Sequence, residues 1–370
     1  MKRILSLLLA SLMSIAIVGC GNGNSSPADS NQSGGGNAKT NVKVGFVYIG
    51  VPGDEGYTYS HDQARKQLEE ELGVETLVVE NVQEDASCAT SIRDLIDRGC
   101  NVIFSNSFGF MDYTLEVAQE FPDVKFFHCS GYKTNDNMSA YFGRMYQARY
   151  LSGIVAGLKT ETNKIGYVAA VAIPEVIRGA NAFALGVASV NPEATVEILF
   201  SGTWYDPSLE RSVAKTLLDK GCDVIAQHQD TTAAQVAAEE SGKFAIGYNS
   251  STANVAPKAY LTAPIWDWSV YVIPQVQAII DGKWEASNEW LPMDTGIVKL
   301  DELTDLCAEG TQEAVDAAMQ KIADGFDVFE GPIKDNEGNV RVKEGEKLTD
   351  EEMLELNWLV ENIVGTMPAD

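Results

Sequence analysis

Aromatic rings and carboxylates recur together in short loops of this 370-residue chain. Residues 51–62 read VPGDEGYTYSHD, which places Asp54 shortly before Tyr57 and Tyr59. The Asp54 carboxylate can accept a hydrogen bond from an amine or a hydroxyl, and the helix that starts here offers free backbone N–H groups. The alternative is an ordinary turn residue followed by surface tyrosines. This loop fits either a polar ligand or a plain helix start.

Three further loops carry the same mixture of groups. The segment 106–110, NSFGF, sets Ser107 beside Phe108 and suits a flat, partly apolar ligand, although core packing is the rival explanation for its rings. The segment 201–207, SGTWYDP, carries Trp204, whose indole offers a stacking face or else a contact on its own helix. Asp230 and Asn249 end successive predicted strands and can supply polar specificity.

The segment 265–268, IWDW, adds Trp266 and Asp267. A ring, a carboxylate and a second ring make a suitable wall for a planar ligand that carries N–H donors. The last tryptophan of this segment fits equally well as a packing anchor of the next helix. We expect the ligand to be held by stacking and hydrogen bonds, with no covalent chemistry.

Catalysis has little support in the sequence. Ser60, His61 and Asp62 are consecutive, and neighbours on one helix point about 100° apart, so they cannot form a relay. The other histidines, His128 and His228, are scattered and fit structural roles. There is no HExxH motif, no paired-carboxylate motif and no GxGxxG fingerprint. We therefore predict no enzyme activity, no metal and no cofactor.

An internal repeat indicates the elements that position these loops. Residues 95–104, LIDRGCNVIF, match residues 217–226, LLDKGCDVIA, and each block fits a helix end, a glycine cap and a buried strand. The surrounding pattern predicts strands at 42–50, 76–80, 102–105, 125–130, 164–171, 196–201, 224–227 and 244–248. It predicts helices at 58–72, 86–98, 113–120, 148–158, 174–190, 207–220 and 233–241. This alternation predicts an α/β fold with two Rossmann-like lobes, each built on a parallel sheet.

Two such lobes side by side form a cleft, and ligands of open α/β sheets bind beyond the carboxyl ends of the strands. A run at 260–265 is expected to return the chain to the first lobe and to supply hinge strands. We therefore assign 42–160 and about 264–370, including a C-terminal tail, to lobe 1, and 161–263 to lobe 2. The tail is expected to hold a small hairpin and a helix at 350–364.

The N-terminus predicts export. Two basic residues precede a short apolar run, and Ile-Val-Gly-Cys ends the segment, so 1–19 fits a signal peptide and Cys20 a lipidated residue. The alternative is a plain signal anchor with an incidental cysteine. Residues 21–41 are rich in Gly, Ser and Asn and fit a flexible tether. The protein should therefore lie on the extracytoplasmic face of the membrane, held by acyl chains.

The composition limits the partners. Acidic residues number 53 against 27 Lys and Arg, for a formal net charge of −26, and no basic stripe is present, so we predict no nucleic-acid binding. Five cysteines follow Cys20, and none of them has CxxC spacing. A buried thiol is the simpler reading of those that precede strands, and we assign no chemistry to any of them.

Longer strings make the chain similar to one family. The strings GDEGYTYSHDQAR, SFGFMD, FPDVKFFHCSGY, NMSAYFGRMYQARYLSGIVAG and WYDP resemble the basic membrane protein (BMP) lipoproteins, over nearly the whole mature chain. This resemblance implies a periplasmic-binding-protein type I fold and a receptor for an ABC importer, with a permease as partner, acting as a monomer. It also implies a purine ligand, a nucleobase or a nucleoside, between two rings that match Tyr57 and Trp204. Asp54 matches an acidic residue of the same loop.

This sequence departs from the family pattern at positions that bear on the ligand. HQDT at 228–231 replaces a glycine-rich turn and introduces Asp230. Asn249 stands where an aspartate that binds ribose is common, and Trp266 stands where a lysine is common. We therefore expect an adenine-like base to be preferred over a nucleoside. Two other functions stay open, a ligand sensor for a membrane partner and, with less support, a nucleoside-processing enzyme.

Overall fold

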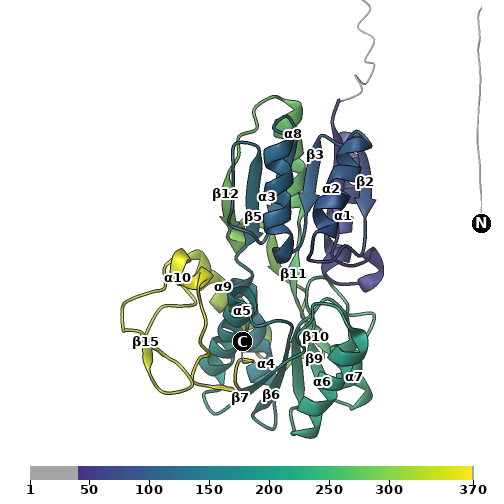
Figure 1. The fold of residues 1–370 in the computed structure, drawn as a ribbon. Coiled ribbons are helices and arrows are strands. Elements are labelled where there is room, and N and C mark those ends of the chain that lie inside the picture. Colours follow the sequence, from purple (N-terminus) through teal and green to yellow (C-terminus); the bar gives the residue numbers. More distant parts are fainter. Residues whose placement is uncertain (1–40, 369–370) are drawn as a thin grey trace, which may run out of the picture. The chain divides into compact units, whose positions relative to one another are not determined.

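The computed structural model describes residues 41–368, and two parallel six-stranded sheets dominate it. The first sheet has the order β12-β5-β4-β3-β1-β2. Its strands are β1 (Lys43–Val47), β2 (Glu75–Val79), β3 (Val102–Ser105), β4 (Lys125–Cys129), β5 (Met138–Gly143) and β12 (Asn288–Leu291). Figure 1 shows this sheet in one lobe of the chain. The apolar strands β3, β4 and β5 are buried on both faces, as parallel sheets require.

The second sheet has the order β10-β9-β8-β6-β7-β16 and repeats the design of the first. Its strands are β6 (Lys164–Ala169), β7 (Thr195–Phe200), β8 (Val224–His228), β9 (Phe244–Ile246), β10 (Tyr260–Thr262) and β16 (Ile363–Val364). We call the parts around the two sheets the first and the second lobe.

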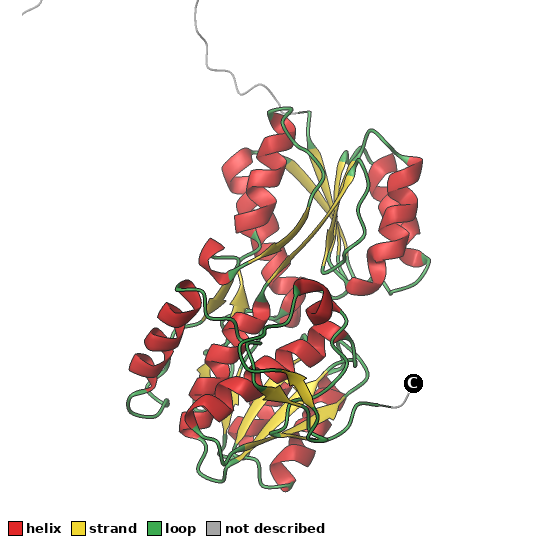
Figure 2. Ribbon diagram, turned by 90° about the vertical axis from the view of Figure 1, so that its left-hand side faces the viewer, coloured by secondary structure: helices red, strands yellow, loops and turns green. Residues whose placement is uncertain are grey.

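Helices cover both faces of each sheet (Figure 2). In the first lobe, α1 (Tyr57–Leu72) and α8 (Ser269–Ile280) pack together, and α2 (Ser87–Asp97) pairs with α3 (Met111–Glu120) on the other face. In the second lobe, α4 (Met145–Lys159) and α5 (Pro174–Val190) lie opposite the pair α6 (Pro207–Asp219) and α7 (Ala233–Glu240). The doubly covered sheets confirm the predicted α/β class.

The two copies of the internal repeat share one backbone feature, a glycine with positive φ after the helix. Gly99 follows α2 with φ +91°, and Gly221 follows α6 with φ +92°, a conformation that residues with a Cβ seldom adopt. Cys100 and Cys222 come next, and both are free and buried. Burial raises the pKa of Cys222 to about 12 and that of Cys100 to about 11, so both stay thiols. Each repeat turns the chain from a helix into a sheet.

A small antiparallel pair, β11 (Pro264–Trp266) with β13 (Val298–Leu300), carries the chain back toward the first lobe. Before it, β10 still pairs with β9 in the second sheet, so the return begins at β11 and not at residue 260. Two backbone hydrogen bonds fix this region, Asn249 N–H to the Pro264 carbonyl (3.0 Å) and Trp266 N–H to the Asn249 carbonyl (3.1 Å). These segments are the hinge strands of the structure.

Strand β5 and helix α4 differ from the sequence prediction. Strand β5, whose six residues are all buried, was missed. Helix α4, which we assigned to lobe 1, packs along α5 in the core of the second lobe. The close fit of the two helices has a local cause, since a Cβ on Gly153 would lie 2.0 Å from the Phe183 carbonyl oxygen.

The C-terminal tail also lies elsewhere than expected. Its last strand, β16, pairs with β7, and its buried residues join the core of the second lobe rather than the first. The predicted helix 350–364 is only α10 (Asp350–Leu354), which begins with a capping box at Thr349. The hairpin β14 (Ile333–Lys334) with β15 (Val340–Val342) precedes it, and α9 (Thr311–Ala323) packs on α4.

Within residues 41–368, no helix combines the length and the apolar character that crossing a bilayer requires. The predicted signal peptide, Cys20 and nearly all of the predicted tether lie outside the described residues.

Candidate functional site

A cavity of about 350 Å³ lies where the carboxyl ends of strands from both sheets meet. The first lobe and the second lobe both contribute side chains, and the lining is Ile49, Tyr57, Asn106, Ser107, Phe108, Ser130, Glu175, Trp204, His228, Asp230 and Tyr248. We call this space the central cavity. Its position is the one that doubly wound sheets use for ligands.

The two aromatic residues that we expected to face each other both line the central cavity. Tyr57 opens α1 in the first lobe, and its hydroxyl donates to the Asn106 carbonyl at 2.5 Å. Trp204 lies in the loop between β7 and α6 of the second lobe, where its carbonyl accepts from the backbone N–H of Asp230 (3.1 Å). The cavity is therefore bounded by one ring from each lobe.

Ser107 and Phe108 also line the central cavity, at the end of β3. The Ser107 hydroxyl donates to the Glu84 carboxylate at 2.6 Å, and the Gly109 N–H donates to the same oxygen at 2.8 Å. Glu84 thus fixes the loop that presents Phe108. Ser107 is engaged with this carboxylate, whereas Phe108 offers a free ring.

Asp230 is the most unusual polar group of the cavity. It is buried, and the described residues 41–368 give its carboxylate no hydrogen bond. Burial, together with the charges of Asp54, Glu210 and Glu175, raises the pKa of Asp230 well above its ordinary value. A buried carboxyl without a protein partner is suited to receive a partner from a ligand.

The sequence reasoning missed Glu175, His228 and Tyr248 as lining residues. His228 ends β8, and its Nε2 lies 3.5 Å from Glu175 and 3.3 Å from the Tyr248 hydroxyl. Burial and the positive charge of Arg149 lower the pKa of His228 to about 4, so the ring is neutral at pH 7. The available signal was that His228 follows one predicted strand and Tyr248 ends the next. We had instead assigned His228 a structural role.

Arg149 is buried and packs against the ring of Tyr248. Its guanidinium carbon is 3.6 Å from the centroid of the Tyr248 ring, and Nη1 donates to the Gln227 carbonyl at 2.7 Å. This cation–π contact fixes the Tyr248 ring against the second lobe. The arrangement places a rigid polar wall, His228 with Tyr248, on one side of the central cavity.

Asp54 and Tyr59 lie outside the lining of the central cavity. The Asp54 carboxylate accepts three backbone N–H groups, from Gly56, Thr58 and Tyr59, each at 2.9 Å. Burial raises the pKa of Asp54, and these three bonds oppose that shift. Asp54 therefore caps the start of α1. The Tyr59 side chain is 37% exposed on the outer surface of the helix.

Asn249, Trp266 and Asp267 serve the hinge and do not line the central cavity. Asn249 has φ +71°, and its side-chain oxygen accepts from the Trp266 indole N–H at 3.1 Å. Trp266 is buried and stacks on the Trp268 ring at 4.2 Å. Asp267 pairs with Lys299 at 2.7 Å, which lowers its pKa. These contacts give the polar groups of Asn249, Trp266 and Asp267 partners within the protein, so no ligand is needed to explain the three residues.

The consecutive Ser60, His61 and Asp62 form no relay. The Ser60 hydroxyl donates to the Tyr57 carbonyl at 2.7 Å and accepts from the Trp268 indole at 3.0 Å, while Asp62 pairs with Arg65. The His61 ring stacks on Trp268 at 4.4 Å. Among residues 41–368 there is no cluster of His, Cys, Asp and Glu able to hold a metal ion.

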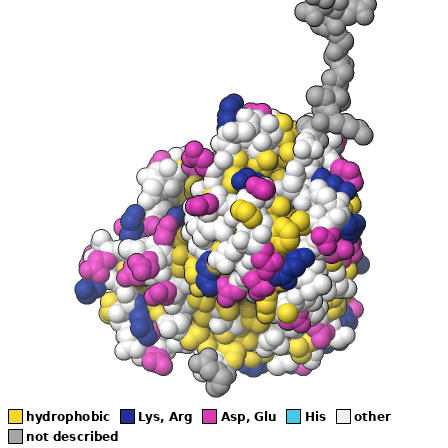
Figure 3. Space-filling view, turned by 45° about the horizontal axis from the view of Figure 1, so that its top comes forward, with side chains coloured by type: hydrophobic (Ala, Val, Ile, Leu, Met, Phe, Trp, Pro, Cys, Tyr) yellow, Lys and Arg dark blue, Asp and Glu magenta, His cyan; other side chains and the backbone are white. Residues whose placement is uncertain are grey.

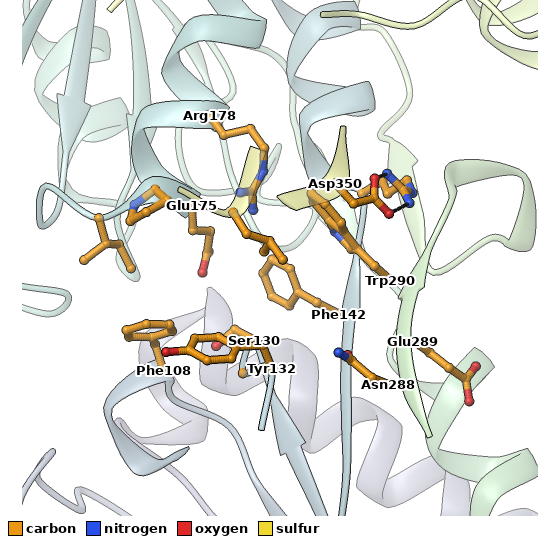
Figure 4. Close-up of a pocket in the computed structure, with 15 residues that line it drawn as sticks. Phe108, Ser130, Tyr132, Phe142, Glu175, Arg178, Asn288, Glu289, Trp290 and Asp350 are labelled. Carbon is orange, nitrogen blue, oxygen red and sulfur yellow. Dashed lines mark hydrogen bonds and ion pairs between the residues drawn. The ribbon is translucent and has the colours of Figure 1, made fainter. Parts of the chain in front are cut away.

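A second, larger cavity of about 940 Å³ adjoins the first (Figure 4). It shares Phe108, Ser130 and Glu175 with the central cavity. The rest of its lining comes from both lobes and from the C-terminal tail: Gly131, Tyr132, Phe142, Arg144, Ile173, Pro174, Arg178, Asn288, Glu289, Trp290, Asp350 and Leu354. We call it the tail cavity.

Comparison with known proteins agrees with this architecture. Residues 41–332 match the Bmp family model, described as ABC transporter substrate-binding protein PnrA-like. A purine-binding protein of Brucella abortus (strain 2308) is 42% identical over 90% of this chain and 96% of its own length. A Haloferax volcanii protein that bears the name of an ABC transporter glucose-binding protein is 38% identical, over 92% of this chain and 85% of its own.

Solved structures show the same fold. A solute-binding protein of an ABC transporter system from Aeropyrum pernix K1 superposes with a TM-score of 0.69 at 19% sequence identity. The match covers 80% of this chain and 93% of that one. At this identity the likeness supports the two-lobed fold alone.

Proposed function

The chain belongs to the Bmp family of PnrA-like ABC transporter substrate-binding proteins, and we propose that it binds a purine in the central cavity. The family and the fold are those of a transport protein and not of an enzyme. The observation that carries the proposal is that Tyr57 and Trp204, from different lobes, line one small cavity. A flat heterocycle between two such rings gains stacking contacts on both of its faces.

The polar groups of the central cavity suit a purine edge. Asp230 has no protein partner among the described residues, and neutral His228 has a buried Nδ1 without one. A purine carries both ring-nitrogen acceptors and N–H donors, so it can engage a carboxyl and an imidazole at the same time. The purine-binding relative from Brucella abortus supports this choice of ligand class.

We further propose that an adenine-like base is preferred over a nucleoside. The buried Trp266 indole, bonded to the Asn249 amide, occupies the hinge where the family resemblance implies ribose-binding groups. The energetic argument is that a ribose hydroxyl without a partner would lose its hydrogen bonds to water on burial.

Calorimetric titration tests this proposal directly. Purified protein, unfolded and refolded to remove any bound molecule, is titrated with adenine, adenosine, inosine and glucose. We expect adenine to bind more tightly than either nucleoside, and glucose to give no heat. Tighter binding of adenosine or inosine would overturn the preference for a base, and binding of glucose alone would overturn the purine assignment. Mass spectrometry of the molecule that co-purifies gives an independent identification.

We propose that the protein works on the extracytoplasmic face of the membrane, anchored through acyl chains on Cys20, and delivers its ligand to an ABC permease as a monomer. The Ile-Val-Gly-Cys segment that ends at Cys20 and the family of the chain support this placement. A Cys20→Ser variant should move from the detergent phase to the aqueous phase in a detergent-partition experiment. Partition of the wild-type protein into the aqueous phase would contradict the anchor.

A further inference from the structure

We propose that the tail cavity is a second ligand site, for a small carboxylate on a flat or apolar body, distinct from the purine site. This inference goes beyond the proposed function and does not depend on it. The cavity holds about 940 Å³ and lies between the edge of the first sheet, the start of α5 and the C-terminal tail.

Arg178 supplies the positive charge. Its side chain projects from α5 into the tail cavity (Figure 4), although the residue is only 4% exposed. Nη1 donates to the Met353 carbonyl at 2.8 Å, which leaves the remaining donors of the guanidinium fork without a partner in residues 41–368. An anion would satisfy these donors, since a guanidinium pairs well with a planar carboxylate.

The neighbouring arginine does not compete for this role. Both nitrogens at the end of Arg144 donate to the Asp350 carboxylate, at 2.7 and 2.6 Å, so its charge is neutralised by a bidentate pair. The indole of Trp290 lies between the two guanidinium groups, 4.5 Å from Arg144 and 4.6 Å from Arg178. This sandwich fixes Arg178 in place before any ligand arrives.

The start of α5 adds a second attraction for an anion. Ile173 and Pro174 line the tail cavity, and no side chain caps the first turn of this 17-residue helix. Its positive dipole end therefore faces the cavity. Glu175 lies in the same turn and lines both cavities. Its carboxylate points toward Phe108 and lies 3.5 Å from His228, so it is held by that ring on the side away from Trp290 (Figure 4).

The remaining walls define the body of the ligand. Phe108, Phe142, Trp290 and Leu354 give the tail cavity apolar surfaces, and the Asn288 amide projects toward it opposite Arg178 (Figure 4). The Glu289 carboxylate points away and accepts from Ser287 at 2.7 Å. A ring or short apolar chain with one carboxylate matches these walls, because its charge meets Arg178 and its body meets the rings.

The test titrates the full chain with benzoate and with its neutral analogue benzamide, once without adenine and once with saturating adenine. We expect benzoate to bind and benzamide not to bind, with adenine affinity unchanged. Arg178→Gln should weaken benzoate binding roughly tenfold or more, because a charge-assisted hydrogen bond is lost. Failure of benzoate to bind, or competition of benzoate with adenine for one site, would overturn the second site.

A second variant keeps the test meaningful if Arg178→Gln does not fold, since that arginine also holds the tail. Leu354 is 44% exposed and lines the cavity, so Leu354→Glu places a negative charge at its edge and leaves every Arg178 contact intact. It should weaken benzoate and spare adenine. Val340→Glu is the matched control, since Val340 is 57% exposed on the tail hairpin and does not line the cavity. Equal benzoate affinity in both variants would contradict the proposal.

Discussion

Gly56 of the first lobe lies directly against the backbone of Asp230 in the second, so close that a Cβ on Gly56 would be 2.3 Å from the Asp230 carbonyl oxygen. The adjacent Ser250 hydroxyl donates to the Glu55 carbonyl. Backbone atoms therefore form the contact between the two lobes at this edge of the central cavity. This arrangement of the two lobes requires a residue without a side chain at position 56.

Gly56→Ala should hold the lobes apart. The added methyl group would have to displace the Asp230 backbone, so the observed contact between the lobes loses stability and purine affinity falls. Small-angle scattering with saturating adenine should give a larger radius of gyration than that of the wild-type complex. Gly53→Ala is the control in the same loop, because its Cβ would meet no atom within 4 Å. Equal affinity in the two variants would contradict this reading of the contact.

Trp204→Ala should weaken adenine binding. Loss of one stacking face costs about 1–3 kcal/mol for a base, which corresponds to roughly 5- to 150-fold in affinity. Titration calorimetry measures the change. Tyr59→Ala serves as the aromatic control, since Tyr59 is exposed outside the cavity and its removal should leave the affinity unchanged. If the Trp204→Ala variant binds adenine with wild-type affinity, the indole does not contact the ligand.

Asp230→Asn should stabilise the ligand-free protein at neutral pH. The folded-state pKa of Asp230 is raised by burial and by nearby carboxylates, so its contribution to stability is present below the unfolded pKa and is lost as the pH rises. The amide cannot ionise and escapes this loss. Thermal unfolding should therefore show a higher Tm for the variant at pH 7 and no gain near pH 3.

The same substitution separates stability from binding. Asp230→Asn keeps a donor and an acceptor in the central cavity, whereas Asp230→Leu keeps neither, so adenine affinity should fall further in the leucine variant. If both variants bind adenine as tightly as the wild type, Asp230 does not contact the ligand.

His61→Phe should reduce acid sensitivity. Burial lowers the pKa of His61 to about 3, so its contribution to stability is present above the unfolded value near 6.5 and is lost as the pH falls toward 3. The stacked phenylalanine does not titrate. The variant's advantage in unfolding free energy should grow by up to about 1.4 kcal/mol per pH unit below 6.5. Denaturant unfolding curves of the wild type and the variant at pH 7 and pH 5 measure this advantage. The same difference in unfolding free energy at both pH values would refute a lowered pKa for His61.

The sequence predicted the fold class because βα periodicity and the glycine-capped repeat are local signals. Strand β3 and helix α5 have the bounds that we expected. Strand β5 and the path of the tail depend instead on which sheet edge accepts a strand, a tertiary choice that neither β12 nor β16 encodes in its own residues.

The site was predictable in part for a related reason. Strand ends correctly indicated where a cavity would form, and Tyr57, Ser107, Phe108, Trp204 and Asp230 all line it. The sequence could not show that the Asp54 carboxylate is used by three backbone N–H groups, or that the Trp266 indole turns into the hinge. Both are matters of side-chain direction. Glu175 escaped notice because helix starts usually carry acidic residues for capping reasons.

The position of Trp290 gives the protein a built-in optical reporter. Its indole belongs to β12 of the first sheet, yet the Arg178 guanidinium beside it belongs to α5 of the second lobe. Any rotation of one lobe against the other must change the charge next to this ring, and indole emission responds to nearby charge. The emission wavelength of Trp290, one of the six tryptophans of the chain, should therefore follow domain motion without an attached dye.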